Sequence, residues 1–403
     1  MRQVPTWATT TSYPAGTASW AGLSTAVDPG TDIFVPEDDL AAEHANFAIK
    51  GAALDGVHAA QHQAMGRSWP RKVFAKTTKD VCPAPGGYAW LSVVDDAGTY
   101  NILEIPNAAD ADSLATWRAN IGGNTPHKMW QFKDGVVVFG QGGTLKRITT
   151  GGGITTPGAV AGSTWDAVGS WTGPGSANGF ALGHSAASLK CFHSQDNGAT
   201  WTSTAAPAAL STVDTGFNRG AYSGTCVMFA PKIEALKYDV LRVTGTAGGY
   251  GTISSVQPNA AGLVYDIVYD RINAKFIAFS DDQSAGADTA ITISVDDGAT
   301  FSAVVTTIPG FVVRSASCEN GVITVLGTPR YQYISDTSTI KLAILYAFVE
   351  DLTKWYRASA DPSDTSVPVI LDANDQEVIA FCDTQIWVSG HTGQLLWTGL
   401  SVP

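Results

Sequence analysis

Charged side chains are scarce in this sequence of 403 residues. Asp, Glu, Lys and Arg together make up 15% of the chain, and they leave a net charge of −12. Long surface helices usually carry many charges, so this scarcity, together with 42 glycines, favours many short strands and tight turns. The acidic balance argues against nucleic acid as a partner, because a phosphate-binding surface is basic, and it offers no attraction to anionic lipid.

Cysteine is also rare, and its spacing argues against two common kinds of site. The five cysteines are odd in number, widely separated and without a CxxC pair, which fits neither a disulfide framework nor a zinc site. Cys226 and Cys382 lie in apolar runs. We expect both to be buried thiols that pack as small hydrophobic side chains.

Long apolar segments are absent as well. The chain has no run of about 18 apolar residues, so we expect no transmembrane helix and no membrane insertion. Residues 1–7 (MRQVPTW) lead into no apolar segment, so we expect no signal peptide and synthesis in a host cytoplasm.

Signatures of common enzymes and cofactor sites are missing too. Residues 149–153 lack the Lys-Ser/Thr ending of a phosphate-binding loop, and no G-x-S-x-G motif occurs. His58 and His62 have helical i, i+4 spacing but lack the Glu of the HExxH zinc motif, so we interpret them as exposed helix residues. The loop at 281–288 does not follow the EF-hand pattern and is interpreted as solvated. We therefore expect no metal and no cofactor.

What the sequence does contain is a repeat. A turn of Gly, Asn or Asp is followed seven times by four or five apolar residues, rich in β-branched and aromatic types. The runs begin near residues 88, 136, 180, 226, 276, 322 and 378, in steps of 44 to 50 residues before a last step of 56. Propeller blades take about 40–50 residues each, and continuous apolar runs are typical of strands buried on both faces. A solenoid would repeat at shorter intervals, and a β-sandwich would not repeat seven times.

The repeat thus predicts an all-β fold over residues 71–403, a propeller of about seven four-stranded antiparallel blades. In one blade we expect strands at 263–269, 276–279, 289–294 and 301–306. The last blade is expected to hold four strands of its own, at 367–371, 378–381, 385–389 and 395–397. Residues 71–76 are expected to form an outlying strand of the first blade.

Two predicted hairpin turns carry a specific pattern. Residues 194–201 (SQDNGATW) fit S-x-D-x-G-x-x-W, and residues 294–301 (SVDDGATF) fit it with Phe for Trp. The pattern resembles the Asp-box, or BNR repeat, of sialidase-like propellers, in which these turns are structural. The resemblance implies that the Asp accepts backbone N–H groups, that the Gly takes a positive φ and that the aromatic ring folds over the turn. The residues concerned are Ser194, Asp196, Gly198, Trp201, Ser294, Asp296, Gly298 and Phe301. Residues 389–393 (SGHTG) are a weaker echo with His for Asp.

The same resemblance raises the alternative of a sialidase-like hydrolase. Such an enzyme would need three arginines on a substrate carboxylate, a Tyr–Glu pair and an acidic Asp. The early Arg-Ile-Pro signature of the family is absent, and no arginine lies in a recognisable family motif. We therefore assign no catalytic residue and expect no enzymatic activity. The arginines considered for binding a substrate carboxylate are Arg118, Arg147, Arg219, Arg242, Arg271, Arg314, Arg330 and Arg357.

A separate candidate for ligand contact is the cation beside two aromatic rings at Arg330, Tyr331 and Tyr333.

Residues 1–70 do not follow the repeat. Residues 1–36 are rich in Thr, Pro, Gly and Ala, which is typical of an extended arm, and Asp38 or Asp39 can cap a helix that runs to about residue 65. The run from Phe34-Val35-Pro36 to residues 42–47 (AEHANF) is similar to the entry segment of many phage tail and fibre proteins. That resemblance implies a virion anchor that binds other virion proteins and supports an oligomer on the particle.

Three functions remain open from the sequence. The preferred one is a non-catalytic phage virion protein, in a tail, a fibre or a surface decoration, whose propeller packs on the particle or binds a host surface glycan or protein. The second is the sialidase-like glycoside hydrolase. The third is a cellular scaffold propeller that binds a protein partner.

Overall fold

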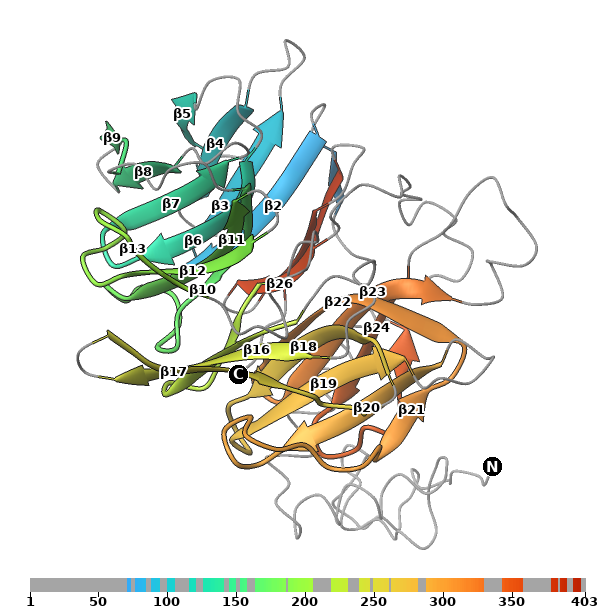
Figure 1. Cartoon of the computed structure of the whole chain (residues 1–403). Coiled ribbons are helices and arrows are strands. Elements are labelled where there is room, and N and C mark those ends of the chain that lie inside the picture. The colour runs from blue at the N-terminus through green and yellow to red at the C-terminus, as the bar shows by residue number, and fades with distance from the viewer. Residues whose placement is uncertain are drawn as a thin grey trace, which may run out of the picture. The chain divides into compact units, whose positions relative to one another are not determined.

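The computed structural model describes residues 71–399 with internal gaps, of which the longest are 206–218, 330–342 and 358–377. The described residues form 28 strands and no helix, and the strands belong to seven four-stranded antiparallel sheets (Figure 1). Gly66–Leu400 is one compact unit. The arm and helix expected within residues 1–70 lie outside the described residues.

Six of the sheets, blades 1 to 6, consist of four strands that are consecutive in the chain and adjacent in the sheet. Blades 1 and 2 contain β2 (Thr77–Ala84), β3 (Tyr88–Val94), β4 (Tyr100–Ile105), β5 (Thr116–Asn120), and then β6 (Pro126–Phe132), β7 (Gly135–Gly140), β8 (Leu145–Thr149), β9 (Ile154–Thr155). Blades 3 and 4 contain β10 (Thr164–Gly169), β11 (Gly179–Ser185), β12 (Ser188–Ser194), β13 (Thr202–Ala205), and then β14 (Ala221–Tyr222), β15 (Cys226–Phe229), β16 (Val240–Thr246), β17 (Gly249–Val256). Blades 5 and 6 contain β18 (Val264–Asp270), β19 (Lys275–Asp281), β20 (Thr289–Ser294), β21 (Thr306–Ile308), and then β22 (Phe311–Glu319), β23 (Val322–Pro329), β24 (Ala343–Phe348), β25 (Tyr356–Arg357).

The seventh sheet joins the two ends of the propeller. Blade 7 runs in the order β26 (Val378–Cys382), β27 (Gln385–Ser389), β28 (Gln394–Gly399), β1 (Arg71–Val73). The expectation that residues 71–76 belong to the first blade was therefore wrong: residues 71–73 pair with β28, from Arg71 opposite Leu396 to Val73 opposite Gln394. Without β1, the edge of β28 would leave its backbone N–H and C=O groups unpaired. The expectation that the last blade holds four strands of its own was also wrong, because β1 supplies its fourth strand. The strand expected at 367–371 lies outside the described residues.

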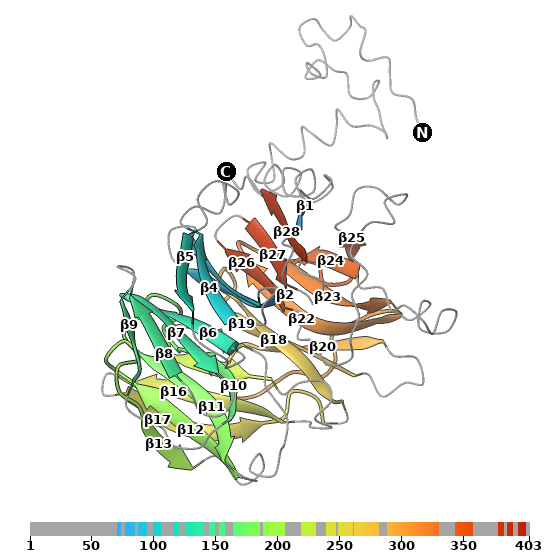
Figure 2. The same ribbon diagram turned by 90° about the horizontal axis from the view of Figure 1, so that it is seen from above.

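The first strand of each blade lies beside the first strand of the next. Contacts join β2 to β6, β6 to β10, β14 to β18, β18 to β22 and β22 to β26, and β26 meets β2 again. Between blades 3 and 4 the backbones approach closely, and Gly220 N donates a hydrogen bond to Val168 O at 3.4 Å. The sheets follow one another around a closed ring, in chain order (Figure 2). The predicted seven-bladed β-propeller is thus confirmed.

The apolar repeat marks the second strand in blades 1 to 6, namely β3, β7, β11, β15, β19 and β23. These strands are covered on both faces by neighbouring blades: all four side chains of β15 are buried, as are Phe276 to Ser280 in β19. In blade 7 the repeat coincides instead with the first strand, β26, which follows the long segment 358–377. This difference accounts for the longer last step.

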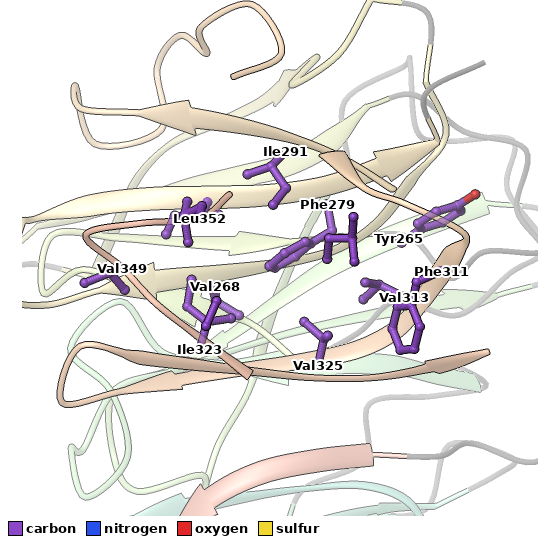
Figure 3. Close-up of a cluster of buried hydrophobic side chains, with 13 residues drawn as sticks. Tyr265, Val268, Phe279, Ile291, Phe311, Val313, Ile323, Val325, Val349 and Leu352 are labelled. Carbon is purple, nitrogen blue, oxygen red and sulfur yellow. The ribbon is translucent and has the colours of Figure 1, made fainter. Parts of the chain in front are cut away.

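The hydrophobic core is divided into clusters that lie between adjacent blades. Between blades 5 and 6, Phe279 and Ile291 meet Val313, Ile323 and their neighbours (Figure 3). Burying one such side chain contributes about 1.5–3 kcal/mol, so the clusters contribute strongly to the contacts between consecutive blades from blade 1 to blade 6. Cys226 belongs to the cluster between blades 4 and 5, as a buried thiol whose pKa burial raises to about 12. The side chain of Cys382 is outside the description.

Within the described ranges, no helix has the length and apolar character needed to cross a membrane. In the same part of the chain, no three His, Cys, Asp or Glu side chains gather in a way that could hold a metal ion.

Candidate functional site

A buried carboxylate on the innermost strand of blade 1 joins three blades. Asp80 is fully buried. One of its oxygens accepts a hydrogen bond from Met129 N in blade 2 at 2.9 Å, and the other accepts one from Nη2 of Arg219, just before blade 4, at 2.6 Å. Arg219 also donates to Val81 O. A single ion pair therefore connects blade 4 to blade 1 across two intervening blades.

Asp266 has the equivalent position in blade 5. Its Oδ2 accepts a hydrogen bond from Ala316 N of blade 6 at 2.7 Å, and its Oδ1 accepts one from Ile267 N at 2.8 Å. Both aspartates follow a β-bulge in the first strand, where the register shifts between Thr78 and Asp80 and between Val264 and Asp266. A bulge re-aims the side chains next to it. Here it directs a carboxylate at a backbone amide of the following blade.

First strands bulge at corresponding places in other blades as well. The register shifts between Pro126 and Lys128 in β6, between Trp165 and Ala167 in β10, and between Val313 and Ser315 in β22. The bulge is therefore a feature of the repeat that the apolar pattern does not reveal.

Tyr222, at the end of β14, is surrounded by side chains from other blades. Its ring makes an edge contact with Trp130 of blade 2 at 6.2 Å, and the guanidinium of Arg271 in blade 5 lies over it at 4.6 Å. A Cβ at Gly173 of blade 3 would overlap the ring, so only glycine allows this approach. Burial raises the pKa of Tyr222 to about 12. Arg271 itself is exposed, which makes this stacked pair a surface that a partner can contact.

The described inner-strand carboxylates cross-link neighbouring blades. The sialidase-like alternative would need a Tyr–Glu pair and an Asp that can donate a proton. The carboxylate oxygens of Asp80 and Asp266 instead accept hydrogen bonds from backbone amides, and Asp80 also accepts one from Arg219. Asp270, also buried, accepts hydrogen bonds from Ile272 N and Asn273 Nδ2 within its own turn.

The two patterned turns join the third and fourth strands of blades 3 and 5, and their internal hydrogen bonds match closely. Asp196 Oδ1 accepts from Thr200 N at 2.9 Å and from Ser194 Oγ at 2.8 Å, while Gly198 N donates to Ser194 Oγ at 3.0 Å. In the other turn, Asp296 Oδ1 accepts from Thr300 N at 2.9 Å and from Ser294 Oγ at 2.7 Å, and Gly298 N donates to Ser294 Oγ at 2.9 Å. Gly198 has a φ of 75° and Gly298 of 78°.

The aromatic residues at the ends of the two turns make different contacts. Trp201 donates from Nε1 to Gly198 O at 3.0 Å, and its ring meets Phe132 of blade 2 edge-on at 6.1 Å. Phe301 has no such donor, and it packs against the core cluster between blades 4 and 5. Both turns therefore reach toward the preceding blade.

Acid unfolding should report on the turn at 294–301. The Thr300 side-chain and backbone hydrogen bonds lower the pKa of Asp296 from 3.8 to about 2. A carboxyl group with a lowered folded pKa adds stability above its ordinary value, and that stability is lost as pH falls through the folded value. We expect the stability difference between the native chain and Asp296→Asn to shrink between pH 3.8 and about 2. Denaturant unfolding at a series of pH values measures it; a difference that stays constant over this range would contradict the assignment.

The candidate arginines whose side chains are described bind different partners. Arg147 and Arg242 each bind a backbone carbonyl of one patterned turn, Arg219 binds Asp80, and Arg314 donates to Thr328 Oγ1 at 3.2 Å. The side chains of Arg118 and Arg357 are outside the description, as are Arg330, Tyr331 and Tyr333. Residues 282–287, His58 and His62 are outside it as well. The echo at 389–393 follows β27, so it joins the second and third strands of blade 7 and is not equivalent to the patterned turns.

Sequence reasoning missed a third turn of related geometry, between β24 and β25 of blade 6. Trp355 Nε1 donates to Leu352 O at 2.9 Å, as Trp201 does to Gly198 O, and Asp351 Oδ1 accepts from Thr353 N at 3.1 Å. The pattern is disguised because Leu352 stands where the others have glycine and the Asp is displaced by one residue. An Asp four residues before a Trp, at the expected point of a blade, was the available signal.

No protein-family model matches the chain, and no curated protein does. Among solved structures, YCF48 bound to a D1 peptide aligns with a TM-score of 0.52 at 10% identity, over 82% of this chain and 96% of that chain. YCF48 from Cyanidioschyzon merolae aligns with a TM-score of 0.52 at 11% identity, over 82% of this chain and 98% of that chain. Likeness at such low identity concerns the fold alone, and it agrees with the β-propeller seen here.

Proposed function

We propose that this chain is a non-catalytic structural protein of a phage virion, in a tail, a fibre or a surface decoration, whose propeller packs on the particle or binds the host surface. The observation that carries the non-catalytic part is the use of the inner-strand carboxylates. Asp80 and Asp266 are buried and bonded to amides of the next blade, and Asp80 is also paired with Arg219. Carboxylates bonded in this way stiffen the ring, which supports a structural role.

The virion part rests on the sequence before the propeller. Residues 34–47 resemble the entry segment of phage tail and fibre proteins, and residue 70 is directly followed by β1, the strand that closes blade 7. An anchor in this position would be attached to the strand that holds the ring together. A load on the anchor would then act first on the β1–β28 pairing.

For the partner, we propose a host surface protein or glycan. One similar structure is YCF48 bound to a D1 peptide, so a propeller of this fold can accept a peptide. In this chain, the exposed Arg271 over the half-buried Tyr222 is the described surface best suited to a partner, because a guanidinium on an aromatic ring can bind acidic groups and flat polar groups alike.

Two experiments test the proposal. The purified full chain is incubated with a panel of sialosides and other glycans, and we expect no release of sugar; clear turnover would overturn the non-catalytic assignment. Separately, the full chain and a chain lacking residues 1–70 are produced during infection and sedimented with the particles. We expect only the full chain to sediment with them, and co-sedimentation of the truncated chain would contradict the anchor.

A further inference from the structure

The patterned turns of blades 3 and 5 each grip the blade before them in the same way, and we infer that they are inter-blade clasps built around one arginine. Arg147 on β8 of blade 2 donates from Nε to Asn197 O at 2.9 Å. Arg242 on β16 of blade 4 donates from Nε to Asp297 O at 2.9 Å. Both carbonyls belong to non-glycine residues with positive φ, 59° at Asn197 and 58° at Asp297. The inference does not depend on the virion assignment.

Packing beneath the arginines shows that the two clasps are equivalent. A Cβ at Gly198 would overlap Val137, which is the cross-strand partner of Arg147. A Cβ at Gly298 would overlap Met228, which is the cross-strand partner of Arg242. The glycine of each turn is thus needed twice, for its positive φ and for its close contact with the strand that carries the arginine.

The two clasps differ in the element that supplies the carboxylate: the earlier blade supplies it in one clasp, and the patterned turn supplies it in the other. In the clasp between blades 2 and 3, Arg147 is paired with Asp134 from the first turn of blade 2, and the patterned turn contributes the neutral Asn197. In the clasp between blades 4 and 5, the patterned turn contributes Asp297. The first turn of blade 4 contributes two neutral hydroxyls there, with Ser223 Oγ and Thr225 Oγ1 donating to the Asp297 carboxylate at 2.5 and 2.7 Å.

Each clasp therefore contains one arginine and one carboxylate. Arg147 forms an ion pair with Asp134 of its own blade, whereas Arg242 is bonded to the backbone carbonyl of Asp297, whose carboxylate accepts from two hydroxyls of blade 4. Arg147 is largely buried, with 14% of its side chain exposed. A partly buried guanidinium compensates one carboxylate, whereas a second carboxylate would meet like charge where water cannot screen it fully. We therefore assign Arg147 and Arg242 as positioning residues that bind the following blade, with the carboxylate count as the determinant of each clasp.

The third turn, in blade 6, is an apolar version of the same contact. Leu352 replaces the glycine, and it points into the cluster with Val268 and Val349 (Figure 3). On blade 5, the cross-strand partner of the buried Ile277 is Ile293, which packs against the same cluster, where blades 2 and 4 have arginine. Loss of the glycine and loss of the arginine thus occur together.

The test is a charge exchange in the clasp between blades 2 and 3. Asn197→Asp places two carboxylates beside Arg147, whereas the double variant Asp134→Ser with Asn197→Asp recreates the arrangement of the other clasp. By hydrogen exchange and mass spectrometry, we expect the amides of 196–200 to exchange on the order of tenfold faster in Asn197→Asp than in the native chain, and the double variant to recover most of that protection. The turn at 294–301 should be unchanged in both and serves as the control within the same molecule.

Equal protection in the native chain and Asn197→Asp would overturn the inference, as would a double variant no better protected than Asn197→Asp. Should Asn197→Asp fail to fold, the reciprocal set answers the same question. Ser223→Asp places a second carboxylate beside Asp297, and Ser223→Asp with Asp297→Asn recreates the first clasp. The inference requires that this double variant protect residues 296–300 better than Ser223→Asp does, and the opposite order would refute it.

Discussion

Replacing Asp80 with alanine is expected to lower the free energy of unfolding by about 3–5 kcal/mol, the range for removing one partner of a buried ion pair. The carboxylate is fully buried and serves both Met129 N and Arg219, so its loss removes the acceptor of an amide in blade 2 and the carboxylate partner of Arg219, which keeps its hydrogen bond to Val81 O. Because the Arg219 side chain keeps 16% exposure and can regain water, we expect the lower end, about 3 kcal/mol. Urea unfolding followed by tryptophan fluorescence measures the change.

Two further variants separate the roles of Asp80. Asp80→Asn keeps an oxygen that can accept from Met129 N and should cost less than alanine, because only the charge and the acceptor for Arg219 are lost. Arg219→Met removes the cation but leaves the hydrogen bond from Met129 N to Asp80 in place. If the ion pair and this hydrogen bond act as one network, the double variant Asp80→Ala with Arg219→Met will be less destabilised than the sum of the single variants. Additive effects would show that the link between blades 1 and 4 is not a coupled interaction.

Asp266→Ala provides the matched comparison within the ring. Asp266 accepts backbone hydrogen bonds from Ala316 N and Ile267 N, and the loss of this acceptor should cost about 1–3 kcal/mol. Urea unfolding measures the cost, and an unchanged stability would contradict a role for Asp266 in joining blades 5 and 6.

The strands that sequence reasoning placed best are those buried on both faces. In β19, Phe276 to Ser280 form a continuous buried run, and such a run is visible without knowledge of the fold. First strands are harder to see, because β2 (Thr77–Ala84) includes Lys79 and Asp80 and has only short apolar stretches. The buried position of Asp80 depends on Arg219, which is 139 residues away, and no local pattern reports that distance.

The patterned turns show the same limit. Their internal hydrogen bonds follow from residues within eight positions of each other, so the Asp and Gly roles could be anticipated from sequence. Their grip on the preceding blade depends on Arg147 and Arg242, which lie 50 and 55 residues before their acceptors. As arginines without a motif they could be interpreted as ligand contacts, and only the structure assigns them to the backbone of the next blade.

Two truncations that differ by three residues are expected to behave very differently. A chain lacking residues 1–70 keeps β1 and should unfold at nearly the native denaturant concentration. A chain lacking residues 1–73 loses the strand that pairs with β28, at Leu396, Leu395 and Gln394, and should be less stable by about 2–4 kcal/mol, at roughly 1 kcal/mol for each hydrogen bond lost from the ladder.

Closure explains why so short a strand has so large an effect. β1 is the strand through which the beginning of the propeller is hydrogen-bonded to its last blade. Without it, blade 7 is held to its neighbours by packing of β26, β27 and β28 against β2 and of β26 against β22 and β23. The exposed edge of β28 would also become available for pairing with another chain, which predicts aggregation as well as instability. Chemical unfolding and size-exclusion chromatography of the two truncations measure both effects. Equal stability of the two chains would show that the ring closes without β1 and would also move the boundary between the N-terminal segment and the propeller beyond residue 73.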